Sequence, residues 1–220
     1  LVTIGTTGHV VVDSYSSVTS ALNGVLVSKM GTYDWVVVAG SMTLAQYKTL
    51  YQSFLDLPFD LNPLAVSIAQ ATYLDPSVSI GTIVDTAAEF EVHLKDSTGA
   101  IFDAVGSFVV VGSIGSTFLA KAMSSIYGSN FDFSYADTPS EVISVSLAQY
   151  GYQQGLTGYT ISDGASEIVN ADLTALALAG NVNIVDTASN ISSEISALSG
   201  IANYINSVTL TDIAPKLSMS

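Results

Sequence analysis

The sequence contains no cysteine, which excludes disulfide bonds, thiolate metal sites and cysteine nucleophiles. Basic residues are scarce as well: five lysines and arginines stand against nineteen aspartates and glutamates, for a formal net charge of -14. Nucleic acid and anionic membranes are bound through lysine and arginine, which displace counterions from phosphate. We therefore expect neither of them as a partner.

Charged residues of either sign make up only 11% of the 220 residues, whereas hydrophobic residues make up 49%. The chain is therefore able to bury a substantial core, and small polar residues must supply much of its surface. Its longest apolar runs, such as 35–39 and 108–111, are too short to cross a bilayer, which predicts no transmembrane segment. A low fraction of charged residues, together with the lack of cysteine, favours an extracellular or bacterial cell-surface protein.

One phrase recurs along the chain: an apolar run, an aspartate, a small residue, alanine, and an apolar residue five places after the aspartate. Its copies occupy 83–90, 161–168 and 184–191, and a related ending reaches residue 212. We expect each carboxylate to accept N–H groups of the next two or three residues and so to cap the helix that follows. These predicted structural helix caps are Asp85, Asp163, Asp186 and Asp212.

The aspartates are regularly spaced in the last third of the chain: Asp186 lies 23 residues after Asp163, and Asp212 lies 26 residues after Asp186. A strand, a turn, a helix of roughly ten residues and a return turn fill such a period. Strands of successive units are then parallel, with helices packed on one side. The sequence predicts an α/β fold, a repeat-based β/α solenoid with short helices, clearest in the C-terminal third.

A second phrase, Leu-Ala-Gln-Tyr, occurs at 44–47 and 147–150, with a looser copy at 67–71. Two interleaved phrases, each present three times, indicate internal repeats. The earlier part of the chain is more degenerate. Strands are predicted over 9–14, 33–39, 79–84 and 108–111, helices over 18–30, 44–57 and 117–127, and breaks at 58–63 and 73–77. We therefore divide the chain into a degenerate α/β N-terminal portion (1–128), a loop or linker (129–140) and a regular β/α repeat coil (141–220).

Together the two phrases resemble the degenerate tandem repeats of large proteobacterial type I-secreted surface proteins, which alternate an Ile-x-Val-x-Asp-Thr-Ala-x-x-Ile phrase with a Leu-Thr-x-x-Gln phrase. The matching positions are 43–47, 85–90, 146–150, 186–191 and 207–212. The resemblance covers 145–212 well and implies a surface-layer, adhesin or matrix component. It also implies that the repeats carry no catalytic residue. The Gly-Gly-x-Gly-x-Asp calcium repeats that often accompany such proteins are absent, so calcium-driven folding is not implied.

Patterns typical of catalysis are weak in this sequence. The glycine-rich turn at 111–116 lies between a predicted strand and helix, but it lacks a third glycine and a nearby Lys-Ser or Lys-Thr pair, which favours a simple β/α turn over a phosphate loop; the turn at 5–8 is discounted likewise. His9 and His93 are the only histidines, and Ser41 lacks the flanking glycine pattern of a serine hydrolase. We assign no catalytic and no cofactor-binding residue.

An acidic and aromatic segment at 128–141 is the best candidate ligand loop. It contains Asp132, Tyr135, Asp137 and Glu141, and carboxylates beside aromatic rings are typical of sugar sites, while carboxylates also bind calcium. In the simpler interpretation, 137–141 begins a helix and the acids are its caps. Ca²⁺ is thus a candidate cofactor and glycans are candidate partners, with no metal ligand set assigned.

These patterns predict a non-enzymatic extracellular structural protein. Its expected partner is itself, because a stack of strands leaves open edges that pair with further strands and so build a homo-oligomer, filament or lattice. The first alternative is a carbohydrate- or calcium-binding surface module, and the second is a secreted carbohydrate-active enzyme.

Overall fold

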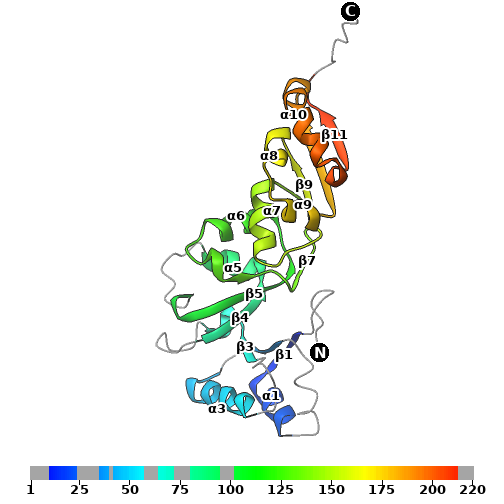
Figure 1. The fold of residues 1–220 in the computed structure, drawn as a ribbon. Coiled ribbons are helices and arrows are strands. Elements are labelled where there is room, and N and C mark those ends of the chain that lie inside the picture. The colour runs from blue at the N-terminus through cyan, green and yellow to red at the C-terminus, as the bar shows by residue number, and fades with distance from the viewer. Residues whose placement is uncertain are drawn as a thin grey trace, which may run out of the picture. The chain divides into compact units, whose positions relative to one another are not determined.

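A computed structural model describes residues 10–23, 35–39, 42–56, 64–71, 80–94 and 102–212. In these residues the chain is α/β, with parallel strands alternating with helices (Figure 1). The chain forms two compact units: the first comprises 1–113 and 124–137, and the second comprises 114–123 and 138–220. None of the described helices combines the length and apolar character needed to span a membrane.

The first unit is a parallel sheet with short helices between its strands. Its strands are β1 (Val10–Ser14), β2 (Trp35–Ala39), β3 (Leu64–Val66), β4 (Ile80–Thr86), β5 (Val105–Ser113), β6 (Phe131–Asp132) and β7 (Ala136–Asp137). Its helices are α1 (Tyr15–Leu22), α3 (Leu44–Leu55), α4 (Ile68–Ala71) and α5 (Ala87–Leu94), with short 3-10 turns at Phe102–Ala104 and Gly128–Asn130. The strand order follows the sequence from β1 to β6, and β7 pairs with β5 beyond β6.

Both faces of this first sheet are covered. Val109, Val110 and Val111 follow one another along β5 and are each at most 2% exposed. Because successive side chains of a strand point to opposite faces, a continuous buried run requires apolar cover on both sides, as parallel sheets usually have. β2 and β5 each have a neighbouring strand on both sides, and their valine-rich composition agrees with these interior positions.

An aromatic cluster fills the core beside β5. Phe108 lies at its centre, with ring centroids of Phe102, Phe131 and Phe90 at 5.0, 5.3 and 5.8 Å. Tyr127 completes the group at 6.0 Å from Phe108, in a T-shaped arrangement. Such edge-to-face contacts stabilise aromatic pairs beyond the area that they bury.

The second unit repeats the strand–helix alternation more regularly. Its strands are β8 (Val142–Ile143), β9 (Thr160–Asp163), β10 (Asn181–Asp186) and β11 (Ser207–Leu210). Its helices are α6 (Ser116–Ser124), α7 (Val145–Gln153), α8 (Ala165–Val169), α9 (Leu173–Leu178) and α10 (Ala188–Gly200), with a 3-10 turn at Ala202–Tyr204. The strands form a parallel sheet in the order β11-β10-β9-β8, so each strand pairs with the next one along the chain.

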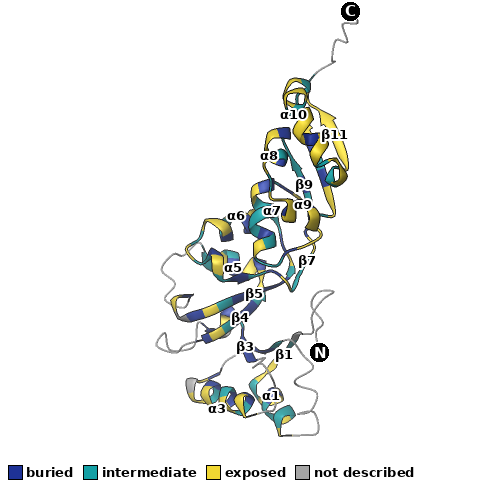
Figure 2. Cartoon of the chain, in the orientation of Figure 1, coloured by how far each residue is buried: buried dark blue, intermediate teal, exposed yellow. Residues whose placement is uncertain are grey.

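One buried row of side chains crosses this second sheet. Ile143, Ile161 and Val182 lie in register on β8, β9 and β10 and are at most 2% exposed. Tyr159 is fully buried before β9, and its hydroxyl donates to the carbonyl of Ala175 at 2.9 Å. A buried phenol needs such an acceptor, because an unpaired buried donor is costly. Burial decreases toward β11 and α10, which Figure 2 colours largely as exposed.

The predicted parallel strands are thus present, while several local details differ. The range 129–140, interpreted as a linker, contains β6 and β7, which pair with β5. The Leu-Ala-Gln-Tyr phrase has two different settings: Thr43 caps α3 in a capping box with Gln46, whereas Ser144 caps α7 and Ser146 lies inside that helix. The predicted breaks at 58–63 and 73–77 lie outside the described residues.

Candidate functional site

Aspartate carboxylates connect successive strand–helix units. Each of the four predicted cap aspartates accepts a hydrogen bond from the first residue of the helix that follows the preceding strand of its sheet, and we call these four aspartates the carboxylate ladder. The bonds are Ile68 N–H to Asp85 at 3.0 Å, Val145 N–H to Asp163 at 2.9 Å, Ala165 N–H to Asp186 at 3.0 Å, and Ala188 N–H to Asp212 at 3.1 Å.

Strand register explains why the partner belongs to the helix that follows the preceding strand. Ile184 on β10 lies opposite Asp163 on β9. Two residues further along each of these two segments, Asp186 therefore lies beside Ala165. The same offset brings Asp163 beside Val145, since Ile143 lies opposite Ile161. The first N–H groups of a helix have no partner inside the helix and carry its positive dipole end. A carboxylate from the neighbouring strand both accepts such an N–H group and places a negative charge at the positive end of the helix.

The sequence predicted that each aspartate caps the helix that follows it, and the hydrogen bonds correct this assignment. In three of the four, Oδ1 accepts a single backbone N–H of the residues that follow, that of Thr86 at 2.8 Å, Gly164 at 3.0 Å and Thr187 at 2.7 Å. Asp186 Oδ1 also accepts from the Asn190 side-chain amide at 2.7 Å, and the residues after Asp212 lie outside the described part of the chain. The threonines then cap their own helices, as Thr187 Oγ1 does by accepting Asn190 N–H at 3.2 Å. One carboxylate thus binds the end of its own strand with one oxygen and the start of the helix after the preceding strand with the other.

Two members of the carboxylate ladder differ in their electrostatics. Hydrogen bonds from the N–H groups of Ala165 and Thr187 and from the Asn190 amide lower the pKa of Asp186. Burial raises the pKa of Asp85, and the hydrogen bonds from Thr86 and Ile68 offset this only in part. Asp186 is therefore ionised more readily than Asp85, because burial opposes ionisation of Asp85.

Glu141 performs a similar task with a longer side chain. Its Oε2 accepts from Ser116 N–H at 2.8 Å and from Ser116 Oγ–H at 2.7 Å, and these bonds lower the pKa of Glu141. Ser116 begins α6, directly after the glycine-rich turn at 111–116. A phosphate would need those same donors. The protein's own carboxylate occupies this helix start, and Gly112, near the end of β5, has a φ of 73° that favours glycine.

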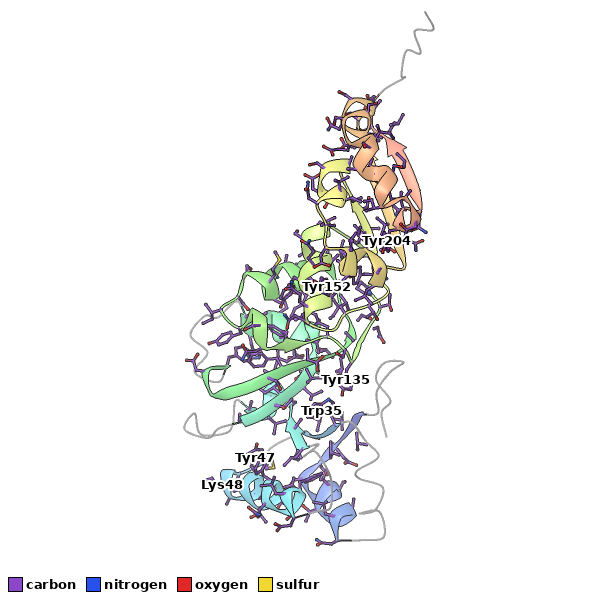
Figure 3. The ribbon with its side chains drawn as sticks, viewed as in Figure 1. Trp35, Tyr47, Lys48, Tyr135, Tyr152 and Tyr204 are labelled. Carbon is purple, nitrogen blue, oxygen red and sulfur yellow. The ribbon has the colours of Figure 1, made fainter. Side chains whose placement is uncertain are left out.

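The other candidate ligand residues have local partners. Asp132 Oδ1 accepts the N–H of Ser134 at 2.9 Å, within its own turn. Tyr135 packs edge-on against Trp35 at a centroid distance of 6.2 Å, as the labelled side chains in Figure 3 indicate. Asp137 pairs with Ser113 in the β5–β7 ladder. These three residues belong to the first unit and Glu141 to the second.

The segment 137–141 does not begin a helix, because α7 starts at Val145 behind the cap Ser144. In the described part of the chain, no group of three or more His, Asp or Glu side chains is arranged to hold a metal ion. His93 lies in the last turn of α5. His9, Ser41 and the turn at 5–8 lie outside the described residues.

Sequence reasoning missed an asparagine that also joins neighbouring units. Asn206 accepts the N–H of Val182 through Oδ1 at 2.8 Å and donates its own N–H to the Val182 carbonyl at 2.8 Å. Asn206 thereby binds the start of β10, while Asp212 binds the start of α10, the helix that follows β10. An asparagine before a strand is too common to reveal this role without the register.

In comparisons with known proteins, no family model matches the chain and no curated protein matches it significantly.

Proposed function

We propose that this chain is a non-enzymatic structural protein of an extracellular or bacterial cell surface, which self-assembles into a surface layer, filament or adhesive matrix. In this proposal its strand–helix units are turns of a β/α solenoid. The supporting observation is the carboxylate ladder: the same hydrogen bond joins neighbouring units four times, at Asp85, Asp163, Asp186 and Asp212.

Several features support a structural role over a catalytic one. The polar groups best placed for chemistry, Glu141 and the ladder aspartates, bind backbone N–H groups at helix starts. These carboxylates therefore join one strand–helix unit to the next. A low fraction of charged residues and abundant hydroxyl side chains suit an exported surface protein, in agreement with the repeat resemblance described above.

Open strand edges support self-assembly. In a stack of strand–helix units, each unit pairs its backbone groups and buries its apolar side chains against the next unit. The last unit of the described array has no such described neighbour. Such an end favours addition of another strand–helix unit, because each addition buries apolar surface and pairs backbone groups.

The proposal is tested by following the state of the purified chain with concentration. Analytical ultracentrifugation, with negative-stain electron microscopy of the same samples, is expected to reveal concentration-dependent assembly and then filaments or sheets. The series is run with and without calcium, so that a dependence on the metal is seen directly. A chain that stays monomeric at high concentration under both conditions would refute the proposed role.

A further inference from the structure

Strand β11 continues the apolar face of the second sheet but leaves it uncovered. Val208 of β11 lies in register with Ile184 of β10, so both side chains point to the same face. Ile184 is 0% exposed, whereas Val208 is 52% and Leu210 is 44% exposed. Ile195, which the helical pattern of α10 places on an apolar face, is 61% exposed. The burial that the neighbouring units receive is therefore missing here.

The outer side of β11 also has no neighbour among the described strands. Among the described strands, β11 pairs with β10 alone. Asn206 N–H points to β10, and backbone groups of successive strand residues point in alternate directions, so those of Ser207 and Thr209 point away from β10. A row of backbone groups that no described strand pairs with, beside uncovered apolar side chains, is a template for another strand.

The first sheet has a matching edge at β1. Among the described strands, β1 pairs with β2 alone. Asp13 lies near its end and accepts Ser14 N–H through Oδ1 at 2.7 Å, as the ladder aspartates do with the residue after them. In the carboxylate ladder the second oxygen accepts from the helix of the preceding unit. No described helix makes that bond to Asp13, whose side chain is exposed.

We propose that the β11 edge of one copy of this chain binds the β1 edge of a second copy, with the strands parallel. This inference rests on the proposed self-assembly and names the surfaces that carry it. The second copy is favoured because every described strand pair is parallel. A two-fold contact between two β11 edges would instead be antiparallel.

The geometry of the contact has a structural consequence. Two different surfaces meet in a head-to-tail contact, so each bound copy presents a new β11 edge to the next one. The assembly therefore grows as a chain of molecules, whereas pairing of two β11 edges would stop at a dimer.

Val208→Lys tests the β11 edge, and Val92→Lys is its matched control. Val92 lies on α5 and is 57% exposed, so the two substitutions change the same residue type at similar exposure. Sedimentation velocity is expected to show self-association weakened at least about tenfold by Val208→Lys and unchanged by Val92→Lys. Both lysines reduce the net negative charge, so general repulsion predicts the opposite result. Thr209→Lys, an exposed change on the same strand, is a second variant if Val208→Lys folds poorly by circular dichroism.

Asp13→Lys tests the other edge, with Asp56→Lys as a control of equal charge change at another exposed position of the first unit. Neither Asp13→Lys nor Val208→Lys is expected to assemble alone. An equimolar mixture of the two is expected to form a one-to-one heterodimer, because each variant keeps the edge that the other has lost.

The outcomes separate this inference from the proposed function. A wild-type chain that never assembles overturns both. A wild-type chain that assembles while Val208→Lys and Asp13→Lys assemble equally well overturns the inference and leaves the structural role standing. Assembly of Asp13→Lys alone, or a mixture that gives no heterodimer, also overturns head-to-tail pairing. Heterodimer formation by two variants that are monomeric alone supports it.

Discussion

Asp163 and Val145 are 18 residues apart in the sequence, yet Asp163 Oδ2 accepts a hydrogen bond from Val145 N–H at 2.9 Å. Val145 is the first residue of α7, and Asp163 ends β9. The bond therefore joins a helix start to the end of the next strand, and it is partly buried. Loss of this bond should destabilise the first turn of α7, whose Val145 N–H donates it.

Asp163→Ala is expected to destabilise the protein by about 1 kcal/mol, the usual cost of removing a helix-capping carboxylate. Hydrogen exchange measured by mass spectrometry should increase in the first turn of α7, around Val145. Faster exchange confined to the first turn of α8 would instead mean that Asp163 caps its own helix. Glu194→Ala, on α10, is the control and should leave both turns unchanged.

The pKa shifts predict opposite pH effects for two equivalent aspartates. The pKa of Asp186 is lowered, so its contribution to stability is present above about pH 4, the ordinary aspartate value, and is lost as the pH falls through the lower folded pKa. The pKa of Asp85 is raised, so its contribution is present at low pH and is lost as the pH rises through the folded pKa.

Urea unfolding of Asp186→Asn and Asp85→Asn at pH 3 and pH 6 checks these signs. The difference in unfolding free energy between wild type and Asp186→Asn should be larger at pH 6. For Asp85→Asn the difference should be larger at pH 3. Equal differences at both pH values, for either variant, would contradict the assigned cause of its shift.

Phe108→Ala is expected to lower the stability of the first unit by about 3–5 kcal/mol, because it removes a ring at the centre of the aromatic cluster and leaves a cavity. Phe108 is 1% exposed. Trp35, the only tryptophan, lies in the first unit and makes its fluorescence a local reporter of urea unfolding. Val92→Ala, at a position 57% exposed, should change the midpoint little.

Gly158→Ala is expected to cost more than Gly81→Ala. Gly158 has φ 74°, and a Cβ there would lie 3.1 Å from Thr138 Oγ1, so the alanine meets backbone strain and a close contact. A left-handed backbone costs a non-glycine residue about 1–2 kcal/mol. Gly81 has no atom within 4 Å of an added Cβ, and alanine there should be neutral or stabilising. Thermal melting of the two variants provides the comparison.

Self-association is expected to strengthen with ionic strength. Copies that each carry a formal charge of -14 repel one another, and salt screens this repulsion over about 10 Å at 0.1 M. Sedimentation at rising sodium chloride concentration should show a growing assembled fraction. A fraction that falls as salt rises would indicate that the contact depends on attraction between opposite charges.

The sequence by itself determined where most strands and helices lie. Apolar runs that end at Asp85, Asp163 and Asp186 are β4, β9 and β10, and a helix follows each after a threonine or glycine. Short-range periodicity and capping chemistry are local properties, so they can be recognised without coordinates. The 23-residue spacing between Asp163 and Asp186 also indicated that successive strands are parallel neighbours.

Only the tertiary structure decided what the carboxylates bind. Asp186 lies at the start of the helix that follows it and also beside the start of α8, and strand register brings its second oxygen to Ala165. Register is set by which apolar side chains share a buried face across strands, and that is a property of the whole sheet. For the same reason the short strands β6 and β7 gave no local signal: they are strands because β5 pairs with them.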